Sequence, residues 1–185
     1  MKNFDANDVA NWILFEAKRQ NIPLTHMKLQ KLLYYAQAYM IGMTGEPLFD
    51  NQIQAWKHGP VIPDVYHKYS KYGGSVISDL DGEVAPDEYA YFISDLVQEK
   101  GHYSAYELRN MTHNEQSWNK AISGNGIVTP EMLNEEFTPI FWTSDEEDDY
   151  QPSFNTKEEE REYFLGKITD EERNAIINSR RNCFC

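Results

Sequence analysis

The sequence of 185 residues is poor in cysteine, in basic side chains and in long hydrophobic runs. Its two cysteines, Cys183 and Cys185, are separated by one residue. They are too close for a structural disulfide and too few for a zinc site, as expected in a reducing compartment. The most apolar stretches, residues 12–15 and 34–43, are too short or too polar to span a membrane. No apolar signal segment follows the first residues, so the sequence favours a cytoplasmic protein.

Basic side chains are strongly outnumbered, because 17 Lys and Arg stand against 30 Asp and Glu and give a net charge of −13. Free-standing nucleic-acid-binding proteins are basic, so direct binding to DNA or RNA is not expected. The acidic excess is uneven: 15 acidic and 11 basic side chains give −4 in residues 1–130, whereas 15 and 6 give −9 in residues 131–185. The acidic C-terminal segment is either a solvated linker or a surface for a basic partner.

What the sequence does contain is enough apolar material for a core, at 41% of all residues. Much of it recurs every three or four positions, as in helices that bury one face. This pattern, with caps at Asp5, Thr25 and Ser104, predicts helices over residues 5–20, 26–43, 63–72, 86–98, 105–111, 115–122 and 130–137. Short alternating segments predict at most a small β element near residues 51–57 and 75–78.

The predicted fold class is therefore mainly α. A compact multi-helix domain is expected over residues 1–142, followed by an acidic helical appendage over residues 143–185. The appendage contains two capping-box patterns, at residues 156–159 and 169–172, but too little apolar surface to fold alone. We expect it to pack against the domain or against a partner, and Phe164 and Ile176 are its candidate contact residues.

The residues that an enzyme requires are not found in a productive pattern. The five histidines do not have the spacing of a metal site, and the Gly124-Asn125-Gly126 fragment follows a predicted helix rather than a strand, unlike a dinucleotide-binding loop. No catalytic, cofactor-binding or metal-binding residue is assigned, and an enzyme is not expected.

The first distinctive segment comprises residues 28–38. Its leucines have the spacing of a buried stripe, whereas Lys28, Lys31, Tyr34 and Tyr35 fall on other faces of the helix. One interpretation is a core helix whose tyrosines complete the packing. The other is a partner-binding surface, since tyrosines beside cations are typical of interface anchors.

The second distinctive segment contains Trp56, Lys57 and His58, followed by glycine and proline and then by Tyr66. Glycine removes the restriction that a Cβ places on the backbone and proline fixes the next φ, so residues 58–60 are predicted to form a turn of one fixed shape. Trp56 suits either the core or an interface. Rigid loops with Trp, Lys and His are good docking elements, so these four side chains are candidate partner-binding residues.

Three motifs together resemble the Panacea-domain family, which includes the SocA-like antitoxins and many phage-associated proteins. They are K-L-Q-K-L-L-Y-Y-A-Q-A at residues 28–38, W-K-H-G-P-V at residues 56–61 with Val65-Tyr66 behind it, and T-H-N-E-x-x-W at residues 112–118. The resemblance covers about residues 5–142.

The resemblance implies a mostly helical antitoxin that binds and neutralises a protein toxin encoded beside it. The toxins of this family are varied, and many block translation. Some members act instead as adaptors that deliver the toxin to a protease, which is the alternative function. The resemblance brings no catalytic residue or cofactor. Because residues 143–185 lie outside it, we expect them to be a candidate toxin-binding element.

Overall fold

The computed structural model describes residues 4–78 and 85–141. The fold of these residues is mainly α, as predicted. The helices are α1 (Ala6–Arg19), α2 (His26–Thr44), α3 (Pro63–Tyr69), the 3₁₀ helix η1 (Ser70–Tyr72), α4 (Asp87–Lys100), α5 (Ala105–Asn114), α6 (Gln116–Ser123) and α7 (Pro130–Phe141). The strands are β1 (Ile53–Trp56), β2 (Gly59–Val61) and β3 (Ile127–Val128).

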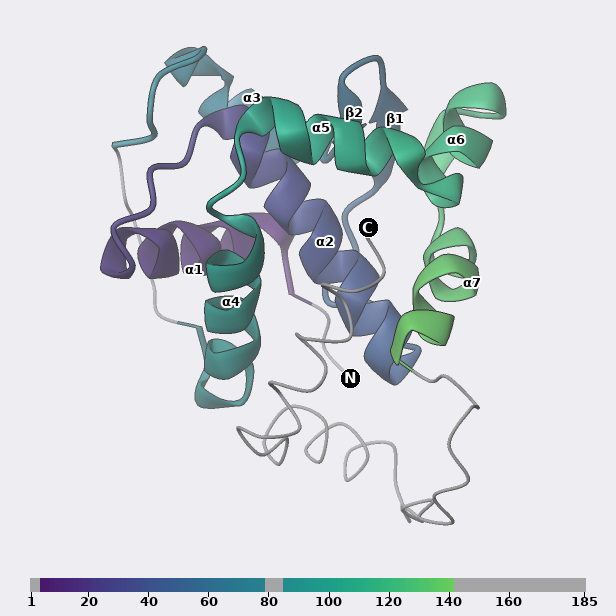
Figure 1. Cartoon of the computed structure of the whole chain (residues 1–185), viewed down its shortest axis with the longest axis horizontal. Helices are drawn as coiled ribbons and strands as arrows, with labels where there is room; N and C mark the ends of the chain where they lie inside the picture. Colours follow the sequence, from purple (N-terminus) through teal and green to yellow (C-terminus); the bar gives the residue numbers. More distant parts are fainter. Residues whose placement is uncertain (1–3, 79–84, 142–185) are drawn as a thin grey trace.

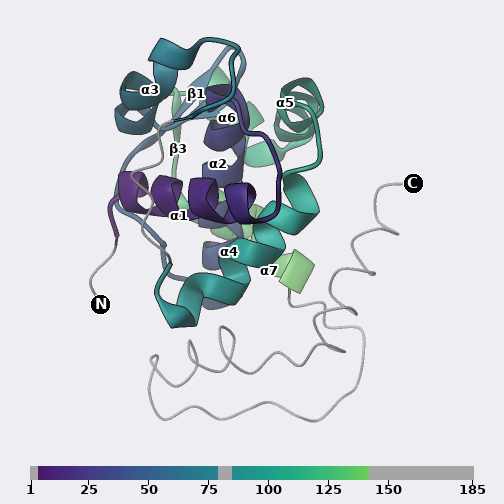
Figure 2. The same cartoon turned by 90° about the vertical axis from the view of Figure 1, so that its left-hand side faces the viewer.

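Helix α2 runs through the middle of the molecule (Figures 1 and 2). It packs against α1 and α4 on one side, against α7 on the other, and against α5 and β2 towards its N-terminal half. Every residue from Lys28 to Gly42 is buried in consequence. A helix covered on all sides is unusual for a domain of this size, and it forms the axis of the hydrophobic core.

The helix ends follow the capping residues in the sequence. The Asp5 carboxylate accepts a hydrogen bond from the Asn7 N–H at the start of α1, and Thr25 caps α2. Ser104 and Glu107 form a reciprocal capping box at α5. Gly45, at φ +72°, ends α2 in the left-handed conformation that glycine adopts without strain.

The three strands form one antiparallel sheet with β1 in the middle. The β element near residues 51–57 is thus confirmed, but the predicted turn at residues 58–60 is wrong by one position. Gly59 pairs with Trp56 and Pro60 with Ala55, so the turn itself consists of Lys57 and His58. Proline is tolerated there because β2 is an edge strand.

Other differences lie where long-range pairing decides the structure. Val76 forms only an isolated bridge with Thr25 instead of a strand, whereas Ile127 and Val128 pair with β1. Helix α7 continues past its predicted end near Phe137 as far as Phe141. The predicted appendage over residues 143–185 lies outside the described residues. Among the helices of residues 4–78 and 85–141, none is long and apolar enough to cross a membrane.

Candidate functional site

The polar side chains of α2 point into the protein. Lys28 is 8% exposed, Lys31 1%, Tyr34 0% and Tyr35 2%. This corrects their interpretation as an exposed surface, because the elements around α2 cover all of its faces. The four residues belong to the core, and their polar atoms are satisfied there by other elements.

Lys31 holds the β1–β2 hairpin from beneath. Its ammonium group donates a hydrogen bond to the Pro60 carbonyl at 2.7 Å. Above it lies Gly59, whose φ of +99° favours glycine. A Cβ at this position would lie 2.8 Å from the Lys31 Nζ and 2.8 Å from the Thr112 Oγ1. The hairpin therefore approaches α2 and α5 as closely as only a glycine allows.

Two glutamines of α2 bind the backbone of the connecting segments. The Gln30 Oε1 accepts the Ile62 N–H at 2.7 Å, just after β2. The Gln37 amide donates to the Phe49 carbonyl at 2.9 Å and accepts the Leu48 and Phe49 N–H groups. Gln37 thus fixes the chain before β1, and Gln30 fixes it after β2, because each buried amide binds backbone groups of these segments.

The two tyrosines fasten the junction between α5 and α6. The Tyr34 hydroxyl is 2.7 Å from the Ser117 Oγ, and the Tyr35 hydroxyl donates to the Glu115 Oε1 at 2.7 Å. Both contacts join residues about 80 positions apart in the sequence, at separations of 83 and 80. Sequence analysis assigned no role to Ser117, although both partners fall within the third motif.

Two further lysines close the opposite end of this network. Lys28 donates to the Gly101 carbonyl at 2.6 Å and to the Pro23 carbonyl at 3.1 Å. The Lys100 ammonium lies 5.1 Å from the centroid of the Tyr35 ring. These contacts connect α2 to the end of α4.

Burial sets the electrostatics of this interior. It lowers the pKa of Lys31 to about 7, with a smaller contribution from Arg109 that outweighs the attraction of Glu115. Burial also raises the pKa of Glu115 to about 7, against the hydrogen bonds from Tyr34 and Tyr35. Lys31 and Glu115 are therefore both easily neutralised near pH 7. This indicates a structural polar network rather than a permanent ion pair.

The third motif joins the hairpin through Trp118. Its indole N–H donates to the Trp56 carbonyl at 3.3 Å. Its ring stacks on the His113 imidazole, with centroids 3.9 Å apart. Thr112, fully buried, faces Gly59. All three motifs of the sequence therefore converge on one hairpin.

Part of this hairpin remains on the surface. Lys57 and His58 are exposed, whereas Trp56 and Tyr66 are half-buried with their ring centroids 4.9 Å apart. The His26 ring lies 5.5 Å from that of Tyr66. We call Trp56, Lys57, His58 and Tyr66 the hairpin surface. Of the predicted partner-binding residues these four are accessible, while Phe164 and Ile176 lie outside the described residues.

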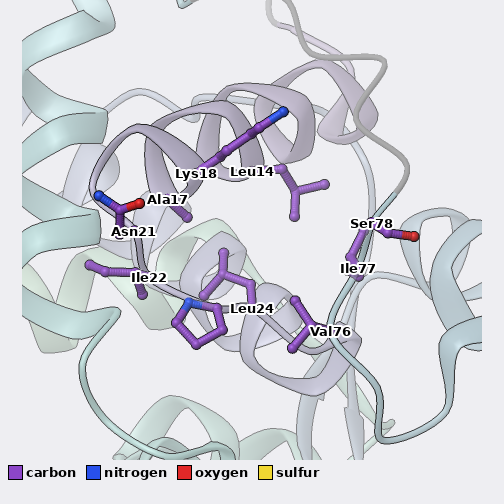
Figure 3. A pocket seen from close by; sticks show the side chains of 10 residues that line it. Leu14, Ala17, Lys18, Asn21, Ile22, Leu24, Val76, Ile77 and Ser78 are labelled. Atoms are coloured by element: carbon purple, nitrogen blue, oxygen red, sulfur yellow. The ribbon is translucent and has the colours of Figure 1, made fainter.

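The described part of the chain offers little for catalysis. It holds no group of three His, Cys, Asp or Glu side chains placed to bind a metal ion. A pocket of about 360 Å³ lies between the end of α1, residues 21–24 and residues 76–78 (Figure 3). Its lining is mostly apolar, and Lys18 is its one charged side chain. The geometry suits binding better than acid–base or nucleophilic chemistry.

Comparisons with known proteins point to one family. Residues 29–119 match the family described as "Antitoxin SocA-like, Panacea domain". The chain is also 41% identical over 76 residues to a protein named "Antitoxin SocA" from Caulobacter vibrioides (strain NA1000 / CB15N). That match covers 41% of this chain and 40% of the relative, so it spans about two fifths of the relative's length. No solved structure matches.

Proposed function

Since the chain carries a Panacea domain of the SocA-like type over residues 29–119, we propose that it is an antitoxin that neutralises a protein toxin by binding it directly. The resemblance in the three sequence motifs is confirmed by the family match, and the relative named Antitoxin SocA supports the antitoxin role. Neutralisation on this proposal is stoichiometric, by covering a functional surface of the toxin, and requires no turnover.

The convergence of the three motifs on the hairpin carries this proposal. Lys31, Gln30 and Trp118 hold the hairpin from below through its backbone. The Lys57 and His58 side chains at its tip have no hydrogen bond or ion pair among the described residues. The backbone of this short turn is fixed by buried contacts, while its exposed side chains have no partner in that part of the chain. Such a turn is suited to binding another protein, because little backbone conformational entropy is lost when it binds.

The composition of the hairpin surface also fits a protein contact. Trp56 and Tyr66 are half-exposed aromatic side chains, and such residues contribute much of the binding energy in protein interfaces. We place the toxin on the hairpin surface, with Trp56 and Tyr66 as apolar contacts and Lys57 and His58 as polar ones.

On this proposal the acidic appendage over residues 143–185 contributes a second contact with the toxin. Its negative charge complements a basic face such as that of a toxin that handles RNA, and translation inhibitors are of this kind. Phe164 and Ile176 supply the apolar part of the contact. The domain then provides a rigid platform, and the appendage covers the toxin.

Co-expression with the toxin encoded beside this gene tests the hairpin surface. The double substitution Lys57→Glu and His58→Glu is expected to abolish both the rescue of growth and the co-purification of the toxin. Lys18→Glu, an equally exposed charge reversal on α1, is expected to keep both. Full rescue by the double variant would exclude this surface.

The amount of toxin in the same cells separates two modes of neutralisation. Occlusion leaves the toxin level unchanged while growth is restored. A protease-dependent fall in toxin level would instead indicate the adaptor function. For the appendage, Phe164→Asp and Ile176→Asp are expected to weaken co-purification, whereas Gln151→Asp in the same segment is not. Wild-type rescue by both apolar variants would exclude a role for these residues.

A further inference from the structure

Helix α5 lies beside the β1–β2 hairpin (Figure 1) and packs against β2. Tyr106, Arg109 and His113 recur at intervals of three and four residues, so they lie on one face of the helix. Tyr106 is 67% exposed. The helix packs against β2, and His58 is close enough to His113 to lower its pKa.

The packing of α5 against β2 and the proximity of His58 to His113 place this row of side chains beside the tip of the hairpin. We call this surface the cationic face and define it as Lys57, His58, Tyr106, Arg109 and His113. It is an unusual feature in a chain with a net charge of −13.

The two full positive charges of this face, on Lys57 and Arg109, are not held in ion pairs within residues 4–78 and 85–141. The Glu107 carboxylate accepts the Ser104 N–H at 2.8 Å in the capping box, and these hydrogen bonds lower its pKa, so it stays negative, and in the described part of the chain it does not pair with Lys57 or Arg109. Glu115 is half-buried, and its pKa is raised to about 7. Burial lowers the pKa of His113, and the charges of Arg109, Lys31 and His58 lower it further, so its neutral form is favoured and the positive charge of the face comes from Lys57 and Arg109.

Polar atoms of the face also lack partners. The Arg109 Nε and the His113 Nε2 are buried and have no hydrogen bond within the described part of the chain. The Arg109 guanidinium is held 5.4 Å from the centroid of the Tyr106 ring, and its Nη1 donates to the Asn110 side chain. Its orientation is thus largely fixed before any ligand arrives. A guanidinium held in one orientation can donate two parallel hydrogen bonds to a single carboxylate.

We propose that the cationic face binds an acidic segment of the toxin, whose carboxylates pair with Arg109 and Lys57 while its chain packs against Tyr106. The identity of the partner rests on the proposed function, but the carboxylate chemistry rests on the face alone. A protein segment is favoured over a nucleic acid because the proposed function pairs this chain with a protein toxin.

Binding of a fluorescein-labelled octaglutamate peptide to the full chain, followed by fluorescence anisotropy at low salt, tests this chemistry without the toxin. We expect saturable binding that weakens about tenfold in Arg109→Glu and in Lys57→Glu. Lys18→Glu makes the same change of net charge on α1 and is expected to keep wild-type affinity. Lys57 lies in an exposed turn, so its variant folds even where Arg109→Glu does not.

Each other outcome overturns the inference. No binding of octaglutamate, or an equal loss in Lys18→Glu, would show that the face has no specific affinity for carboxylates. Equally tight binding of a fluorescein-labelled oligothymidylate of the same length would assign the face to phosphates and nucleic acid. The proposed function is read separately from growth rescue: rescue without octaglutamate binding refutes the cationic face alone, whereas binding without rescue refutes the antitoxin role.

Discussion

At the scale of single residues, Gly59 and Lys31 depend on each other. The lysine satisfies its charge at the Pro60 carbonyl, and the glycine leaves the room that the lysine side chain occupies. Neither requirement is visible in the sequence. Lysines are usually exposed, so the Lys-Leu-Gln-Lys pattern resembles an exposed helix face. A lysine is buried only where a group accepts its hydrogen bonds, and here that group is distant in the sequence.

We expect Gly59→Ala to destabilise the fold by about 2–4 kcal/mol, because the added methyl group meets Lys31 and Thr112 in a backbone conformation that already disfavours it. Gly45→Ala is the matched control. Gly45 also has a positive φ, of +72°, but has open space around it, so a loss of about 1 kcal/mol is expected. Urea denaturation measures both. Equal losses would contradict the steric account.

Lys31 and Glu115 together predict a minimum of stability near pH 7. The pKa of Glu115 is raised from 4.5 to about 7, so the folded chain binds more protons than the unfolded chain between these values, and its stability falls as the pH rises. The pKa of Lys31 is lowered from 10.5 to about 7, so the unfolded chain binds more protons above pH 7, and stability rises again.

Single substitutions separate the two limbs of this profile. We expect Glu115→Gln to remove the fall below pH 7 and Lys31→Met to remove the rise above it. Urea denaturation between about pH 5 and about pH 9 gives the unfolding free energy of each variant relative to the wild type. Difference profiles that are flat in both variants would show that folding shifts the pKa of neither group.

At the scale of helices and strands, local signals sufficed for most of the fold. Caps such as Asp5, Thr25 and Ser104 are local hydrogen-bonding devices, so the helix starts could be predicted from neighbouring residues. The position of the hairpin turn and the strand at residues 127–128 could not, because both are decided by pairing with β1 across the chain.

The sequence also predicted which segments matter for the site. It identified the three motifs as the distinctive segments of the chain. It did not show that they meet at one hairpin, or that most of their polar groups face inward, since both depend on tertiary packing.

Helix α6 receives its N-terminal cap from another helix. The Glu136 carboxylate of α7 accepts the Gln116 N–H at 2.7 Å and the Ser117 N–H at 2.8 Å. We expect Glu136→Gln to cost about 1 kcal/mol, because the charge that complements the helix dipole is lost.

The neighbouring substitution Glu135→Gln serves as the control. It removes only the exposed pair with Lys120 and is expected to change stability by less than about 0.5 kcal/mol. Thermal unfolding by circular dichroism compares the two. A larger loss in Glu135→Gln would contradict capping between the helices.

At the scale of the whole molecule, α2 is the element against which most of the other helices pack. Its burial from Lys28 to Gly42 predicts that its amides exchange with solvent only when the entire domain unfolds. Hydrogen exchange of the full chain should therefore give Leu32 and Leu33 a free energy equal to that of global unfolding, and the amides of Ser70–Tyr72 a smaller one. Fast exchange within α2 would show that the domain opens in parts.

The hairpin is anchored through its backbone, so the exposed side chains of its turn take no part in holding the fold together. Lys31 and Trp118 bind the Pro60 and Trp56 carbonyls, groups that every amino acid supplies. Lys57 and His58 can consequently be substituted without unfolding the domain. One scaffold of this design can acquire new specificities by changing its outermost residues alone, and libraries randomised at positions 57 and 58 are the natural place to retarget it.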